Sequence, residues 1–152
     1  MTDSNTNTAS RTSTKAVGAI ATLAAASFLL GALLHAGVEV PLGVATLAEP
    51  EILPAVIVEG ICAVVLSIGA YGLLAGRRWG PRAARAASVV AVGGVLIGTT
   101  ALALGAGPRT QFNDLLHVVM LVLLLMALGL LPSQKVERAQ RTDLPRRGLS
   151  AG

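Results

Sequence analysis

Residues 52–82 read ILPAVIVEGICAVVLSIGAYGLLAGRRWGPR, an apolar run that leads directly into a basic turn. A helix needs about 20 mostly apolar residues to cross the hydrocarbon core of a bilayer. Residues 52–75 supply such a run, and Glu59 is its only charged residue. Pro54 falls in the first turn, where a helix tolerates proline best. The turn at 76–82 holds three arginines and a tryptophan, which are typical of a membrane interface. This stretch therefore predicts one transmembrane helix and the turn into the next.

Three further apolar runs of similar length lie on either side of this stretch. They cover about residues 16–35, 83–104 and 112–131. The third of the four runs ends in Gly-Ala-Gly-Pro, and the fourth ends at Pro132. Both are strong stop signals for a helix. We therefore predict an all-α integral membrane four-helix bundle with short loops.

The remaining segments are polar and divide the chain into three parts. Residues 1–14 are rich in Ser, Thr and Asn, so we expect a disordered cytoplasmic tail. The transmembrane domain then covers residues 15–132, with an exposed loop at 37–51. Residues 133–152 are polar and basic and predict a flexible cytoplasmic tail.

Composition supports a lipid environment over a soluble one. The 152 residues are 53% hydrophobic and 13% charged, whereas soluble domains are about one quarter charged. Ala and Gly are abundant, and Gly94 and Gly98 form a small-xxx-small pair that favours close helix contact and self-association as a homo-oligomer. The single cysteine, Cys62, lies within an apolar run, so the chain has no internal disulfide.

The basic residues predict the orientation of the chain. With four spans, all Lys and Arg residues except Arg109 lie on one side, together with both termini. Lys and Arg stay on the cytoplasmic side, so both termini are expected there, in a bacterial plasma membrane. The basic turn and tail are placed to contact anionic lipid headgroups of the bilayer. Nucleic-acid binding is disfavoured, because no aromatic residues alternate with the basic ones.

The first span has a second interpretation, as a cleaved signal peptide. Its apolar core is longer than the usual 7–15 residues of such a peptide, and it lacks a clean small-x-small cleavage site. These features favour a retained signal-anchor.

The few ionisable residues within the spans gather at one depth. In the predicted topology, His35 ends the first span on the outer side, and Glu59 lies about two turns into the second from that side. Asp114 and His117 occupy the first two turns of the fourth span, with Asn113 on the same helical face. Placing a carboxylate in hydrocarbon costs free energy, so Glu59 is expected to face the bundle interior. The residues at the same depth are therefore the candidate site.

Two histidines with carboxylates are suited to three kinds of chemistry. The set His35, Glu59, Asp114 and His117 could bind a transition metal such as zinc. It could also relay protons, or hold a haem between opposite imidazoles. Ordinary hydrogen bonding near the interface is the simpler explanation of the histidines, and Asp114 is a favourable residue for a helix N-terminus.

No sequence motif specifies an activity. The chain has no P-loop, no HExxH and no CxxC. We therefore predict a small multi-pass membrane protein that is not an enzyme and serves as an accessory or self-associating protein. One alternative is a metal- or haem-binding redox protein, and another is a small transporter-like oligomer with Glu59 as its proton or cation site.

Overall fold

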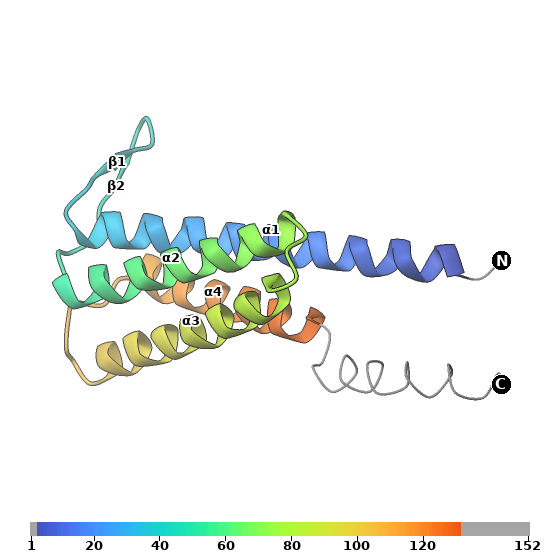
Figure 1. Ribbon diagram of the computed structural model, residues 1–152. Coiled ribbons are helices and arrows are strands. Elements are labelled where there is room, and N and C mark those ends of the chain that lie inside the picture. Colours follow the sequence, from blue (N-terminus) through green and yellow to red (C-terminus); the bar gives the residue numbers. More distant parts are fainter. Residues whose placement is uncertain (1–2, 132–152) are drawn as a thin grey trace, which may run out of the picture.

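The computed structural model describes residues 3–131, with side chains from residue 13 onward. All four helices of this part of the chain are long and apolar enough to cross a membrane (Figure 1). The spanning part of the first helix is Ser13–His35. The helices are α1 (Asp3–His35), α2 (Leu53–Leu74), α3 (Gly80–Ala103) and α4 (Gln111–Leu130). The prediction of four spans in an all-α bundle is confirmed.

Glycine and proline set the boundary between α2 and α3. Gly76 has a left-handed φ of 63°, which glycine adopts without a steric penalty. The next amide, of Arg77, donates to the Gly72 carbonyl at 2.8 Å, in the pattern of a Schellman cap. The helix α3 begins at Gly80, earlier than predicted, because Pro81 fits its first turn.

The N-terminal end of α1 differs from the expectation for residues 1–14. We expected disorder, but the helix begins at Asp3. Ser, Thr and Asn are poor helix formers, yet extending an existing helix is much easier than nucleating a new one. The helix of the apolar span therefore continues through the polar segment. The expectation for residues 133–152 lies outside the described residues.

The loop between α1 and α2 is exposed, as predicted, and holds a small hairpin. The strands β1 (Val40–Pro41) and β2 (Thr46–Leu47) pair antiparallel, with Val40 opposite Leu47. The hairpin projects from the end of the bundle where α1 ends and α2 begins (Figure 1).

The helices pack in a closed ring, each against its neighbours in sequence, and α4 closes against α1. Small side chains fill the interior, and many large ones face outward. The buried set includes Ala24, Ala63, Ala70, Ala87 and Ala91, and the exposed set includes Leu29, Ile57, Ile68, Val89, Val122 and Leu125. In water, the large apolar side chains would be buried. In lipid, they can face the hydrocarbon without a cost in free energy, and small interior side chains let the helices approach closely. The chain is a membrane protein.

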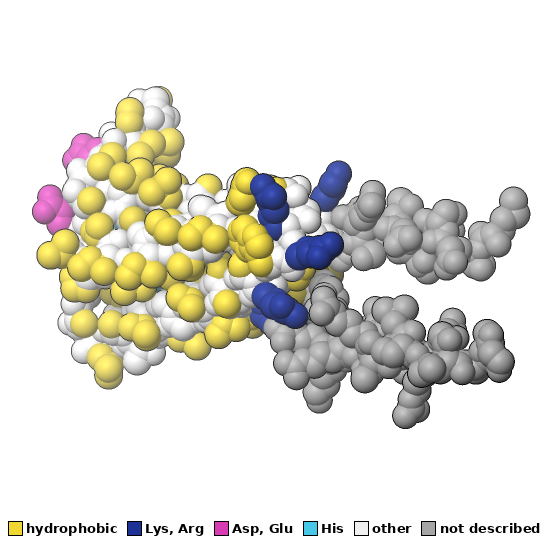
Figure 2. Space-filling model, in the orientation of Figure 1, with side chains coloured by type: hydrophobic (Ala, Val, Ile, Leu, Met, Phe, Trp, Pro, Cys, Tyr) yellow, Lys and Arg dark blue, Asp and Glu magenta, His cyan; other side chains and the backbone are white. Residues whose placement is uncertain are grey.

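Charge divides the bundle along its length. On the face drawn in Figure 2, the described Lys and Arg side chains gather at the end that carries the α2–α3 turn, and the acidic ones lie at the hairpin end. The two ends of the apolar band therefore carry opposite charge.

Candidate functional site

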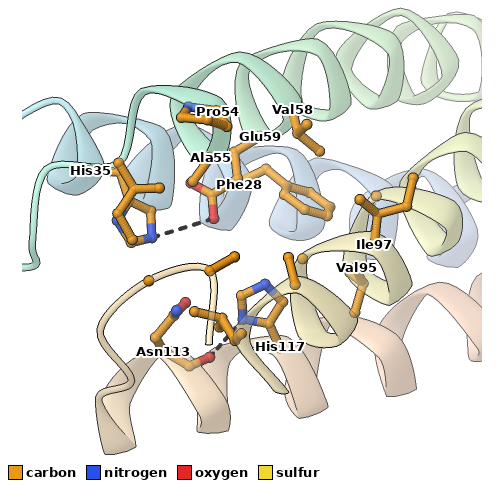
Figure 3. Close-up of a pocket in the computed structure, with 17 residues that line it drawn as sticks. Phe28, His35, Pro54, Ala55, Val58, Glu59, Val95, Ile97, Asn113 and His117 are labelled. Carbon is orange, nitrogen blue, oxygen red and sulfur yellow. Dashed lines mark hydrogen bonds and ion pairs between the residues drawn. The ribbon is translucent and has the colours of Figure 1, made fainter. Parts of the chain in front are cut away.

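A cavity of about 170 Å³ lies inside the hairpin end of the bundle (Figure 3). Its wall is almost entirely apolar and includes Phe28 of α1, Val58 of α2 and Val95 of α3. Four polar side chains also line it, from α1, α2 and α4: His35, Glu59, Asn113 and His117. All four helices thus contribute to one site.

The cavity exists because α2 and α3 diverge toward the hairpin end (Figure 1). At the basic end their backbones touch, since a Cβ on Gly69 would lie 2.8 Å from the Ala84 Cα. Halfway along, a Cβ on Gly94 would lie 2.9 Å from the Cys62 Sγ. Beyond this point the space between the helices is left open as the cavity.

His35 is held in one orientation by the loop that follows it. Its Nδ1 lies 3.0 Å from the Pro50 carbonyl oxygen, which can only accept, so Nδ1 carries the hydrogen and donates. The Ile52 amide also donates to the His35 carbonyl, at 3.1 Å. The second ring nitrogen, Nε2, is thereby turned toward Glu59, whose Oε1 lies 3.8 Å away.

Glu59 is buried, with 7% of its surface exposed, and Oε2 of its carboxylate has no hydrogen-bond partner among the described residues. Its Oε1 lies 3.8 Å from His35 Nε2, which is longer than a hydrogen bond. Gly31 of α1 makes room for this carboxylate, because a Cβ there would lie 2.7 Å from Oε2. A buried polar atom without a partner costs about 1–3 kcal/mol, and more if it is charged. Such an atom on a cavity wall is suited to bind a ligand.

His117 is fixed in the same way as His35. Its Nδ1 lies 2.8 Å from the backbone carbonyl oxygen of Asn113, one turn earlier on α4, and must donate to it. Its Nε2 lies against α3, where a Cβ on Gly98 would be only 3.1 Å away. With Glu59, His117 also lines a smaller neighbouring space of about 10 Å³, roughly the room that one water needs.

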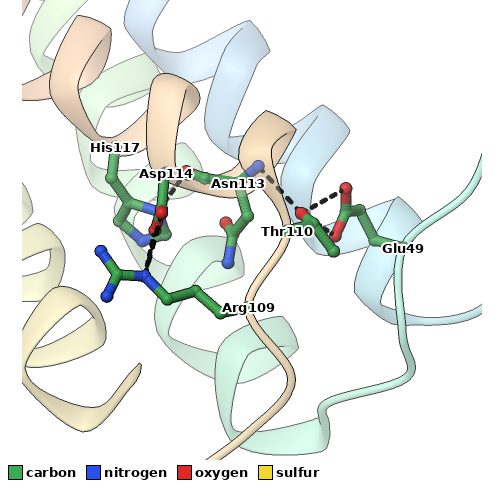
Figure 4. A network of polar contacts seen from close by, with 6 residues as sticks. All are labelled: Glu49, Arg109, Thr110, Asn113, Asp114 and His117. Carbon is green, nitrogen blue, oxygen red and sulfur yellow. Dashed lines mark hydrogen bonds and ion pairs between the residues drawn. The ribbon is translucent and has the colours of Figure 1, made fainter. Parts of the chain in front are cut away.

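A polar network outside the cavity joins α4 to the long loop (Figure 4). The Thr110 hydroxyl accepts from the Asn113 amide at 3.1 Å and so caps α4. The same hydroxyl donates to the Glu49 carboxylate, whose oxygens lie 2.8 and 2.9 Å away. Arg109 Nε donates to both oxygens of Asp114, at 2.9 and 3.0 Å, on the exposed side.

The structure brings three of the four predicted site residues to one cavity. His35, Glu59 and His117 line it, whereas Asp114 is paired with Arg109 outside. Among the side chains of residues 13–131, no group of three or more His, Cys, Asp or Glu lies close enough to hold a metal ion.

Sequence reasoning missed several contributors to the site. The sequence did not identify Gly31 and Gly98 as the positions that leave room for the side chains of Glu59 and His117. The residues next to these glycines in the sequence give no indication of this role. Thr110 was identifiable, because a threonine three residues before Asn113 is a favourable N-cap. The Pro50 carbonyl carries no sequence signal at all. No protein-family model, curated protein or solved structure matches this chain.

Proposed function

We propose that this chain is a small-molecule-binding protein of the bacterial plasma membrane that is not an enzyme. Both termini lie in the cytoplasm, and the cavity lies in the outer half of the bilayer. The basic turn at residues 76–82 supports this orientation, because Lys and Arg flanking spans remain cytoplasmic.

The cavity of about 170 Å³ is the observation that carries the proposal. An apolar cavity of about 150 Å³ stays dry and binds benzene, so this one has room for a ligand of similar size. Ligand sites are typically apolar with a few polar groups that fix the orientation of the ligand. The histidines and Glu59 supply those groups at one place on the wall.

The ligand reaches the site from the lipid. Pro54 and Ile97 both line the cavity and are themselves exposed on the apolar surface, at the divergence of α2 and α3. A lipid-soluble molecule in the outer leaflet enters there without crossing the polar loops.

Two serines of the spans, Ser27 and Ser67, support binding rather than catalysis. Ser27 and Ser67 donate to the carbonyls of Leu23 and Ala63, each one turn earlier in the same helix. The hydrogen of each hydroxyl is thus used within its own helix, which disfavours a role as a nucleophile.

The alternatives from the sequence receive less support. A haem is far larger than a cavity of benzene size. The predicted metal site of four residues is incomplete, because Asp114 forms an ion pair with Arg109. A transport path through Glu59 has to pass the packed interior on the cytoplasmic side, where Cys62, Leu66 and Leu124 are fully buried. Self-association stays a prediction for the outer surface, since Gly94 and Gly98 are used in contacts within the chain.

A cavity-filling variant tests the proposal. We expect 4-fluorobenzyl alcohol to bind the purified protein in neutral detergent, as followed by fluorine NMR. Ala101 lines the cavity, so Ala101→Phe is expected to abolish binding. Ala103→Phe on the same helix adds an equal side chain at an exposed position away from the cavity and is expected to bind as wild type does. Equal binding by both variants, or none by the wild type, contradicts the proposal.

A further inference from the structure

The polar end of the cavity has a definite hydrogen-bonding character, because both imidazoles are fixed. His35 and His117 each use Nδ1–H to donate to a backbone carbonyl. In a neutral imidazole the other nitrogen is then an acceptor with a free lone pair. Each ring therefore offers Nε2 as an acceptor at the cavity.

Glu59 adds two more acceptor atoms at the same place. Its Oε1 lies 3.8 Å from His35 Nε2, which is longer than a hydrogen bond and leaves room for a bridging N–H. Its Oε2 is buried without a partner among the described residues. Figure 3 shows the carboxylate between His35 and the ring of Phe28.

The cavity wall holds no cation to balance this carboxylate. No Lys or Arg is among the described residues that line it. Arg109, the basic residue in the loop before α4, is engaged with Asp114. The site thus combines acceptors and a carboxylate with an apolar wall. Its described lining holds no Lys or Arg, and the Asn113 side chain supplies an uncharged N–H donor.

We propose that the cavity binds a small lipophilic primary amine as its ammonium ion. This inference rests on the proposed binding function and specifies the class of ligand. An ammonium group has three donors and no acceptor, which complements Glu59 Oε2 and the Nε2 atoms of His35 and His117. The apolar body of the amine lies along the wall between α2 and α3, and the Phe28 ring adds a cation–π partner.

Three probes of nearly equal shape test the chemical class. Benzylamine is an ammonium donor at neutral pH, benzyl alcohol is a neutral donor and acceptor, and benzaldehyde is an acceptor only. We expect wild-type protein in neutral detergent to bind benzylamine about 10-fold or more tightly than benzyl alcohol, because hydrogen bonds to charged groups are about twice as strong as neutral ones. Benzaldehyde is expected to bind most weakly.

A substitution assigns the preference to the carboxylate. Glu59→Gln keeps the shape of the side chain and is expected to bind benzyl alcohol while losing the preference for benzylamine. Glu51→Gln, which changes an exposed carboxylate at the same end of the bundle, is the matched control and is expected to keep the preference.

The outcomes separate the two proposals. If the three probes bind wild-type protein with equal affinity, or if Glu59→Gln keeps the preference, the amine assignment is wrong and the binding function stands. If none of the probes binds wild-type protein, both are wrong. The wild-type series decides the amine assignment by itself should Glu59→Gln fail to fold.

Discussion

At the scale of single residues, Glu59 is the described residue whose side chain holds a buried polar atom without a hydrogen-bond partner. A carboxylate within a transmembrane helix normally finds a partner or faces water. The nearest atom of His35, Nε2, lies 3.8 Å from Oε1, and Oε2 has no hydrogen-bond partner among the described residues. A purely structural carboxylate is expected to satisfy both oxygens, so this arrangement favours a role in binding.

Gly31 gives a direct test of how tightly the carboxylate is held. Gly31→Ala places a Cβ 2.7 Å from Glu59 Oε2 and forces the carboxylate to move. Because Oε2 ends a flexible side chain that can shift, we expect the free energy of unfolding to fall by only about 1 kcal/mol, at the low end for overpacking. The measurement is denaturant unfolding of the purified protein in mixed micelles.

Gly60→Ala is the matched control for this substitution. Gly60 lies within α2, and a Cβ there meets nothing within 4 Å. The added methyl raises helix propensity by up to about 1 kcal/mol in water, so we expect equal or greater stability. Equal losses in the two variants refute the assigned role of Gly31.

At the scale of elements, the shape of the α2–α3 pair creates the site. The two helices touch at the basic end through residues with no or small side chains, such as Gly69, Gly80 and Ala84. They diverge toward the hairpin end, where α4 and the long loop complete the wall. Close contact between α2 and α3 at the basic end thus determines the width of the gap between them at the hairpin end.

Gly80→Ala is expected to disrupt this pair. A Cβ on Gly80 overlaps the Gly72 carbonyl, which is backbone and has no rotamer to change. We expect a loss of about 1–3 kcal/mol or more in the free energy of unfolding, with weaker binding at the cavity. Thermal unfolding and fluorine NMR with 4-fluorobenzyl alcohol measure the two effects.

The control for Gly80→Ala lies on the same helix. A Cβ on Gly93 meets nothing within 4 Å, so Gly93→Ala is expected to leave binding unchanged and stability equal or greater. If Gly80→Ala is as stable as Gly93→Ala, the contact between the two helix backbones does not hold the pair together.

At the scale of the whole molecule, the bilayer is the solvent that makes this fold stable. The exterior is apolar along the length of the helices, and the described basic side chains in Figure 2 gather at one end. Within the bilayer, the hydrophobic effect does not drive helices together. Close packing of small residues therefore has to hold the bundle together.

Cysteine labelling in intact cells tests the orientation. Val44 lies fully exposed in the hairpin, and Arg78 lies exposed in the basic turn at the opposite end. We expect a membrane-impermeant maleimide to label Val44→Cys and to leave Arg78→Cys unlabelled until the cells are lysed, because the proposed orientation puts the basic turn in the cytoplasm. Wild-type protein is the blank, since its single cysteine, Cys62, is buried. The reverse pattern refutes the orientation.

The sequence by itself determined the number of spans, their approximate ends and the depth of each polar residue. Hydropathy, proline and glycine act locally along the chain, so they predict where a helix crosses the bilayer. The shared depth of His35, Glu59 and His117 followed from helical rise and the alternating direction of the spans.

Only the tertiary structure decided which of these residues meet. Depth is one coordinate, whereas contact also depends on how each helix is rotated and how far it stands from its neighbours. Packing sets both, and it turned Glu59 toward His35 but left Asp114 outside with Arg109. The cavity depends on the divergence of α2 and α3, which is set by backbone contacts between residues distant from the site.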